Sequence, residues 1–317
     1  MDKTMAYACK NIDSEIRLKS SSGGVFYALA DNVISQGGIV FGARFNEKWE
    51  VVHSCCYNVS ELKYFMGSKY AQSQLGNVFL HVKSNLNNNR QVMFVGTPCQ
   101  IGGLLKYLGH EYDNLILVDF VCHGVPSPKV WQNYLHEMFD DSEINEISFR
   151  DKTEGWQRYS LRIVSDKFTY QKKKNEDWYM KGFLKNIYLR PSCYECAFKG
   201  KVKESDFTLA DFWGVEEILP EFYDKSGVSL LFVHSEKGMN LWRLVQEQFV
   251  SQEVSMEMAL EKNRVAFSSS VRPSGRNVFF STMGTVQTRV KKATEDYFWL
   301  KVIKKLRKLF RIERKRV

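Results

Sequence analysis

Two short apolar runs separated by a helical stretch constrain the fold of this chain more than any other feature. Residues 91–95 and 115–121 have the composition of buried strands, and a Gly-Thr-Pro turn opens a helix between them. A strand–helix–strand unit of this kind gives parallel strands in one sheet. Ligands bind at the carboxyl ends of such strands, just past which Cys99 and Cys122 stand. We therefore expect these two cysteines to be neighbours.

The same alternation of helices and strands extends along the chain. A helix started by a serine N-cap and stopped by Gly-Gly is expected within residues 20–38. Further strands are expected at 39–45, 51–57, 147–152, 159–165, 168–171, 208–213 and 229–235. The predicted fold class is mixed α/β (α+β): a βαβ-containing core with an additional antiparallel β region and a C-terminal amphipathic helix.

The charge of the chain is concentrated at its end. Of 45 Lys and Arg and 36 Asp and Glu, residues 301–317 hold 9 basic and 1 acidic, so the remaining body is nearly neutral. Nucleic acid is therefore not an expected partner. Residues 298–317 also carry an apolar stripe, which predicts an amphipathic helix that packs on the body or makes peripheral membrane contact. The stripe comprises Phe298, Val302, Leu306, Leu309 and Phe310.

Three parts and a location follow from these patterns. We expect an α/β part at 1–145, a mixed α+β part carrying a C-x-x-C loop at 146–290, and a basic amphipathic tail at 291–317. The sequence shows no apolar run of transmembrane length and no secretory leader. The prediction is a cytoplasmic protein, with its tail as a candidate contact at the inner membrane face.

Four cysteines carry the strongest chemical signal. Cys193 and Cys196 form C-x-x-C, which lets two thiolates grip one metal centre, and the strand-end residues Cys99 and Cys122 can complete four sulfur ligands. A 4Fe-4S cluster is the favoured interpretation. Structural zinc, a redox dithiol and unrelated buried cysteines stay open, although zinc sites commonly use two C-x-x-C knuckles and this chain has one.

Two turns that open helices offer groups for a phosphate. The first turn offers hydroxyls and backbone N–H groups from Ser21, Ser22, Gly23 and Gly24. The second turn offers the same kinds of group from Gly96 and Thr97. Lys69 is a candidate partner for a phosphate or a flavin ring, and His123 a candidate proton relay. For each of these an ordinary structural role stays open.

Read in order, several segments together resemble the coenzyme F420 hydrogenase/dehydrogenase beta subunit family, from about residue 15 to 280. They are RLKSSSGGVFYALA, GGIVFGARF, GSKYAQS, VMFVGTPCQIGGLL, LILVDFVCHGVPSPKVW, FRDKTEGW, LRPSCYECAFKG and SDFTLADFWG. The resemblance implies an iron-sulfur flavoprotein of the C-terminal domain type, without the N-terminal ferredoxin module of many members. It implies a 4Fe-4S cluster on Cys99, Cys122, Cys193 and Cys196. It also implies FAD rather than FMN near SSGG, Lys69 and GTPCQ, and the last motif makes Gln100 a further candidate for the flavin site. Residues 1–145 are then the expected flavin- or cluster-binding part.

The function that this resemblance implies is electron relay by an oxidoreductase. An external one-electron donor such as ferredoxin would exchange electrons with the cluster, the cluster with FAD, and FAD with a two-electron acceptor, coenzyme F420 or another small molecule. Some relatives accompany polysaccharide biosynthesis, so that context is a further expectation. No catalytic residue is assigned. The alternatives are a non-catalytic metal- or cluster-stabilised scaffold in a membrane-associated assembly and a sugar-modifying transferase.

Overall fold

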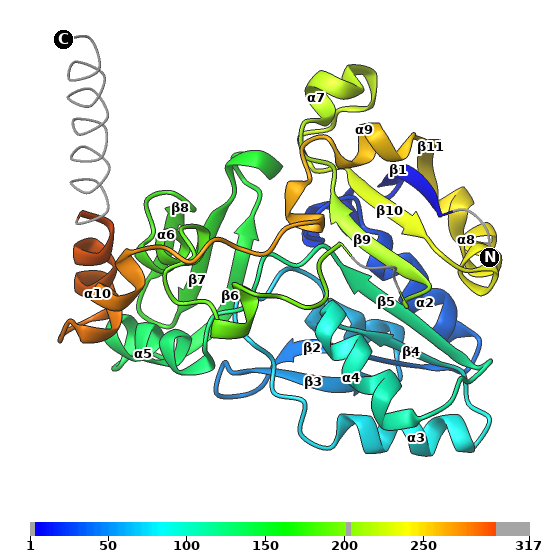
Figure 1. Ribbon diagram of the computed structural model, residues 1–317, viewed down its shortest axis with the longest axis horizontal. Coiled ribbons are helices and arrows are strands. Elements are labelled where there is room, and N and C mark those ends of the chain that lie inside the picture. Colours follow the sequence, from blue (N-terminus) through cyan, green and yellow to red (C-terminus); the bar gives the residue numbers. More distant parts are fainter. Residues whose placement is uncertain (1–3, 201–203, 296–317) are drawn as a thin grey trace, which may run out of the picture.

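A large mixed sheet, on the right of Figure 1, is the main element of the protein in a computed structural model that describes residues 4–200 and 204–295. Four of its strands, β2, β4, β5 and β9, run parallel, and the others are antiparallel to their neighbours. In spatial order the strands are β11 (Phe249–Glu253), β1 (Met5–Asn11), β10 (Ser229–Val233), β9 (Phe207–Asp211), β5 (Leu115–Phe120), β4 (Val92–Val95), β2 (Ile39–Phe45) and β3 (Val51–Cys56).

Helices cover both faces of the parallel strands, which explains why the sequences of these strands are mainly apolar. On one face α2 (Val25–Ser35) packs on β2 and β4, in a core that includes Val40, Met93 and Ile116, and α8 (Glu236–Val245) packs against α2 and β10. On the other face, α3 (Val78–Asn87) and α4 (Pro98–Leu108) share a core with strand residues such as Phe41 and Phe94, which directly follow Val40 and Met93 in the sequence. Successive strand residues point to opposite faces, so each strand contributes to both layers.

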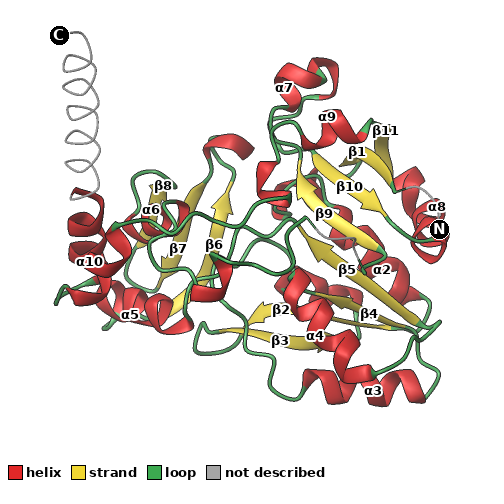
Figure 2. Ribbon diagram, in the orientation of Figure 1, coloured by secondary structure: helices red, strands yellow, loops and turns green. Residues whose placement is uncertain are grey.

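A second, three-stranded antiparallel sheet lies beside the first, on the left of Figure 2. It consists of β6 (Ile144–Asp151), β7 (Ser160–Ser165) and β8 (Thr169–Lys173). It shares an aromatic core with α5 (Pro128–Phe139), α6 (Trp178–Leu184) and α10 (Gly275–Ser281), in which the rings of Trp131 and Tyr179 lie 4.9 Å apart. The small sheet therefore has a hydrophobic core with helices of its own.

Shorter elements complete the described chain. The α-helices are α1 (Ser14–Lys19), α7 (Val215–Ile218) and α9 (Met256–Leu260). The 3-10 helices are η1 (Val59–Tyr64), η2 (Trp156–Arg158), η3 (Pro191–Cys193), η4 (Pro220–Phe222), η5 (Gln246–Gln248) and η6 (Arg264–Ala266). Residues 286–295 are also helical. No helix within the described ranges is long and apolar enough to cross a membrane.

The mixed α/β class, the βαβ unit and the antiparallel region are confirmed. The serine N-cap is wrong: α2 begins after Gly24, whose φ of 90° is left-handed, and no side chain caps it. Sequence patterns also did not predict β1, which pairs between β10 and β11. The apolar stripe of the tail lies outside the described residues. A boundary near residue 145 stays a prediction, while the large sheet takes strands from both sides of that position.

Asp206 connects the parallel strands to α8. Its buried carboxylate accepts hydrogen bonds from the Leu117 amide at 2.7 Å and from the Ser235 hydroxyl at 2.5 Å. Ser235 in turn caps α8 by accepting from the Gly238 amide at 2.9 Å. One carboxylate therefore joins β5, the start of β9 and the beginning of a helix.

We predict that Asp206→Ala lowers the free energy of unfolding by about 3 kcal/mol, because it leaves a buried amide without its charged acceptor. Urea unfolding followed by circular dichroism measures this. Glu146→Ala is the matched control, since its side chain is 59% exposed and its carboxylate pairs with Arg162 at the surface; a change below about 0.5 kcal/mol is expected there. Equal midpoints for the two variants would contradict the role of Asp206.

Candidate functional site

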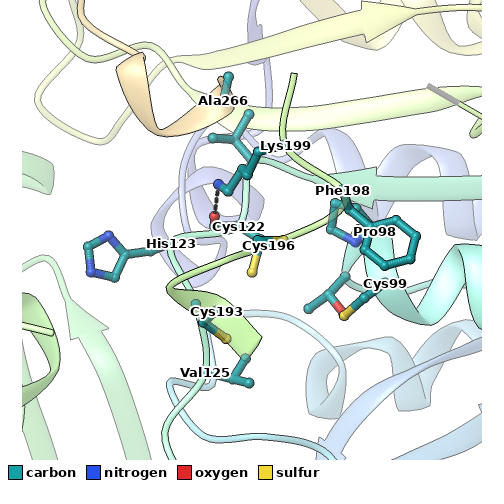
Figure 3. Close-up of a pocket in the computed structure, with 13 residues that line it drawn as sticks. Pro98, Cys99, Cys122, His123, Val125, Cys193, Cys196, Phe198, Lys199 and Ala266 are labelled. Carbon is teal, nitrogen blue, oxygen red and sulfur yellow. Dashed lines mark hydrogen bonds between the residues drawn. The ribbon is translucent and has the colours of Figure 1, made fainter. Parts of the chain in front are cut away.

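Two loops at one edge of the large sheet place Cys99 and Cys122. The loop after β4 leads through Thr97 to α4, where Cys99 stands in the first turn behind Pro98. The loop after β5 carries Cys122. Because β4 and β5 are parallel neighbours, both loops leave the same edge, and the two cysteines line one pocket (Figure 3). The expected proximity is confirmed.

The C-x-x-C loop closes the same pocket from the other side. Its start is fixed by the Arg190 amide, which donates to the Val125 carbonyl at 2.9 Å, and Cys193 ends η3. The Cys196 amide donates to the Ser269 hydroxyl at 2.9 Å. All four predicted cysteines thus line one pocket, partly open to solvent, to which Phe198 and Lys199 also contribute.

Gly124 permits the close approach of these loops. Its φ of +127° is unfavourable for other residues, and a Cβ there would lie 2.8 Å from Leu189 Cδ1 and 3.2 Å from Cys193 Cβ. The glycine directly after Cys122 and His123 therefore lets the C-x-x-C loop pack against the loop that follows β5.

Burial raises the pKa of two of the thiols that line the pocket. It raises the pKa of Cys122 to about 12, although the Lys199 ammonium and the Gly124 amide oppose the shift. Burial also raises the pKa of Cys193, against the Val125 amide. Lys199 donates to the Cys122 carbonyl, which holds its positive charge beside this cysteine. Within residues 4–200 and 204–295, no three His, Cys, Asp or Glu side chains are grouped for a single metal ion.

The SSGG turn lies at the edge where β9 ends and β10 begins. The Ser22 hydroxyl donates to the Val228 carbonyl at 2.7 Å, and the Gly23 amide donates to the Ser229 hydroxyl at 2.8 Å. These two groups therefore hold the turn in place. The partly exposed Ser21 instead has its hydroxyl 2.8 Å from that of Ser68.

Residues 67–74 connect the predicted flavin residues with one another. At one end Ser68 contacts Ser21, and Lys69 follows directly. At the other end the Gln100 side chain donates to the Ser73 hydroxyl at 2.9 Å. The segment thus runs from the SSGG turn to the GTPCQ turn, which brings the two groups of candidates together.

Lys69 is a partly buried ammonium without an ion-pair partner among the described residues. Its Nζ donates to the carbonyls of Phe65, Met66 and Gly67 at 3.2, 2.8 and 3.3 Å. Burial, and then the nearby Arg44 guanidinium, lower its pKa to about 7. Near neutral pH this amine can therefore hold or release a proton.

The GTPCQ turn is closed by its own side chains. Gln100 Oε1 accepts from the Thr97 amide at 2.9 Å and from the Thr97 hydroxyl at 3.1 Å. Gly96 is buried, and its amide donates to the Val118 carbonyl at 3.1 Å. The Thr97 hydroxyl also lies 3.1 Å from Cys99 Sγ. The turn therefore contacts the cysteine pocket and segment 67–74 at once.

His123 lines the pocket, but its ring is directed away from the cysteine sulfurs (Figure 3). The ring lies edge-on to Phe183 at 5.0 Å, and Phe183 stacks on Tyr70 at 4.6 Å. Burial lowers its pKa, with Asn186 opposing the shift, and its Nε2 lacks a hydrogen-bond partner among the described residues. Its place fits a proton relay between the pocket and segment 67–74, a role that stays a prediction.

Sequence reasoning passed over Arg150 and Lys152, which the structure buries beside the SSGG turn. Lys152 Nζ donates to the Ser22 carbonyl at 3.1 Å. The sequence signal that could have indicated them is the pair of basic residues in FRDK, at the end of a predicted strand. Basic residues at such a position are ordinarily interpreted as part of a solvent-exposed turn.

Comparison with known proteins gives the family. A family model that describes the C terminus of the beta subunit of coenzyme F420 hydrogenase/dehydrogenase matches residues 89–257, more than half of the chain. The chain belongs to the coenzyme F420 hydrogenase/dehydrogenase beta subunit family. The resemblance read from the sequence is thereby confirmed. The matched range contains all four pocket cysteines of this beta subunit homologue, whereas the SSGG turn and Lys69 lie before it.

A solved structure shows the same fold. The beta subunit homologue is similar to a chain of the F420-reducing [NiFe] hydrogenase complex from Methanosarcina barkeri, with a TM-score of 0.53 and 15% identity over 96% of this chain and 92% of that one. No curated protein matches. Hydrogenases and dehydrogenases are oxidoreductases, so family membership indicates a general role in electron transfer.

We predict that Gly23→Ala lowers the free energy of unfolding by about 2 kcal/mol or more, because the added Cβ would lie 2.2 Å from the Cys9 carbonyl oxygen and displace the SSGG turn. Thermal unfolding measures the loss. Gly103→Ala is the control, since its Cβ would meet only Phe79 at 3.6 Å within a helix and should not destabilise the protein. An unchanged unfolding midpoint for Gly23→Ala would contradict the prediction, because it would show that the SSGG turn accommodates the added Cβ with no loss of stability.

Proposed function

We propose that this protein is an iron-sulfur flavoprotein that relays electrons between a one-electron donor, a 4Fe-4S cluster, FAD and a two-electron acceptor. The observation that carries the proposal is the convergence of Cys99, Cys122, Cys193 and Cys196 on one pocket at the carboxyl edge of the parallel strands. Membership of the beta subunit family supports a redox role. Ferredoxin is the proposed class of donor, and coenzyme F420 or another small molecule the acceptor.

The donor set of the pocket fits an iron-sulfur cluster. Four thiols from three separate segments line the pocket. In a 4Fe-4S cluster each cysteine binds a different iron, so ligands that come from several sides of a pocket suit it. Binding would displace the protons that burial keeps on Cys122 and Cys193. Lys199 and the N-terminus of α4 would offset the negative charge of the bound thiolates. A bound cluster supplies one-electron transfer.

The residues along segment 67–74 fit a flavin. Ser21 offers a hydroxyl, and Lys69 offers an ammonium that can hold a proton near neutral pH. The Thr97 hydroxyl contacts both Gln100 and Cys99, so the same turn borders the cysteine pocket. A bound flavin supplies the exchange between one-electron and two-electron steps. His123 Nε2 offers a second buried proton carrier on the path between the two groups.

The cluster is tested by anaerobic absorption spectroscopy with iron and sulfide analysis. We predict about four iron atoms per wild-type chain and a broad brown band that bleaches with dithionite. Cys193→Ser should lose most of this band, because one of the four ligands is removed. Cys55→Ser is the matched control, since Cys55 is a partly buried residue of β3 outside the pocket.

The outcomes separate the proposed relay from its alternative. A colourless wild-type protein that takes up no iron after anaerobic reconstitution, and instead carries about one zinc ion per chain, would overturn the relay. That result would favour the metal-stabilised scaffold. An unchanged band in Cys193→Ser would refute the assignment of this ligand.

Flavin binding is tested separately by fluorescence titration of the apoprotein with FAD. We predict that Lys69→Gln weakens FAD affinity by about tenfold, because it removes the ammonium of the residue that follows Ser68, whose hydroxyl contacts Ser21. Lys63→Gln, in the exposed part of η1, should leave the affinity unchanged. Equal affinities for both variants would remove Lys69 from the flavin site.

A further inference from the structure

A group of cations lies between the small sheet and the end of β9. Arg150 belongs to β6, Lys174 follows β8, and Lys152 follows β6. The Arg150 side chain is 4% exposed, and its Nη1 donates to both oxygens of Asp211, the last residue of β9, at 3.0 and 2.7 Å. This places the group at the carboxyl edge of the parallel strands, where ligands of such sheets bind.

Two aromatic rings hold two of the cations in place. The Arg150 guanidinium lies over the rings of Tyr159 and Trp213, at 4.7 and 5.7 Å from their centroids. Lys174 Nζ lies over the same rings, at 4.6 and 5.5 Å. Such packing fixes the direction in which a guanidinium presents its donors.

Positive charge is in excess at this position. Lys152 Nζ donates to the carbonyls of Arg17, Ser22 and Ser226 at 2.7, 3.1 and 2.6 Å, and Lys174 Nζ to the Gln157 carbonyl at 2.7 Å. Within the described ranges, Asp211 is the one carboxylate that forms an ion pair with any of the three cations. Burial, and then Arg150, lower the pKa of Lys152 to about 7, as expected for cations that repel one another.

The guanidinium of Arg150 has a free edge. Its Nε and Nη2 are buried and have no hydrogen-bond partner among the described residues, while Nη1 is committed to Asp211. Nε and Nη2 form the side-on edge of the fork, the geometry that matches two oxygens of a carboxylate or phosphate. Buried donors of this kind are rarely left without an acceptor.

We propose that Arg150, with Lys152 and Lys174, binds an anionic oxygen group, a phosphate or a carboxylate. This inference rests on the proposed function for the identity of the ligand: the group belongs either to the diphosphate of the flavin or to an acidic acceptor. Lys152 contacts the SSGG turn through the Ser22 carbonyl. Tyr70 lies close to Arg150 and leads through the stacked ring of Phe183 towards the cysteine pocket.

The test is isothermal titration calorimetry of the full chain with inorganic pyrophosphate. We expect binding by the wild type that weakens at least about tenfold in Arg150→Lys, because lysine cannot present two coplanar N–H donors. Lys174→Gln, which leaves the buried Arg150–Asp211 pair intact, should weaken it as well. Arg162→Gln is the control: Arg162 lies on β7 of the same sheet and pairs with Glu146 at 3.1 Å. Unfolding midpoints verify that each variant is folded.

Titrations with FAD and riboflavin identify the source of the anion. If the flavin supplies it, FAD loading abolishes pyrophosphate binding, and Arg150→Lys weakens FAD but not riboflavin. If the acceptor supplies it, pyrophosphate still binds with FAD present, and FAD affinity is unchanged. Absence of pyrophosphate binding in the flavin-free wild type overturns the proposal. So does binding by folded Arg150→Lys and Lys174→Gln that is as tight as binding by the wild type. Cys193→Ser should bind pyrophosphate like the wild type, so loss of the cluster and loss of the anion site are distinguishable.

Discussion

The parallel pairing of β4, β5 and β9 is the constraint on which the rest of the structure depends. Because these strands point the same way, the loops that carry Cys99 and Cys122 and the carboxylate of Asp211 leave the sheet at one edge. The SSGG turn reaches the same edge because β10 begins there beside the end of β9. Chemistry-bearing residues from distant parts of the chain therefore meet without long excursions of the backbone.

Electrostatics gives the two ends of this edge opposite characters. At the cysteine pocket burial raises the pKa of the Cys122 thiol, so a metal centre must displace protons to bind, and Lys199 offsets part of the resulting charge. Around Arg150, three cations lie close together, and within the described residues Asp211 is the carboxylate that forms an ion pair with one of them. The first arrangement suits a cluster of bound thiolates, and the second suits an anion from outside the chain.

Local signals in the sequence were sufficient for much of the fold and for part of the site. Apolar strands around Met93 and Ile116 and the GTPCQ turn predicted the βαβ unit, since a strand buried on both faces needs a continuous apolar run. The strand β1 escaped notice because its residues alternate weakly and its pairing with β10 and β11 is non-local. The serine cap was wrong because Ser22 bonds to Val228 across the sheet edge, not to its own helix.

The sequence by itself determined which chemistry is available: four cysteines of suitable spacing, two glycine-containing turns, and the family to which the chain belongs. Tertiary structure decided which of these groups face one another. It brought the C-x-x-C loop to Cys99 and Cys122, used Ser22 and Gly23 to hold the turn, and buried Arg150 against Asp211. The physical reason is that pairing across the sheet fixes distances between residues far apart in sequence, whereas composition and spacing report only on neighbours along the chain.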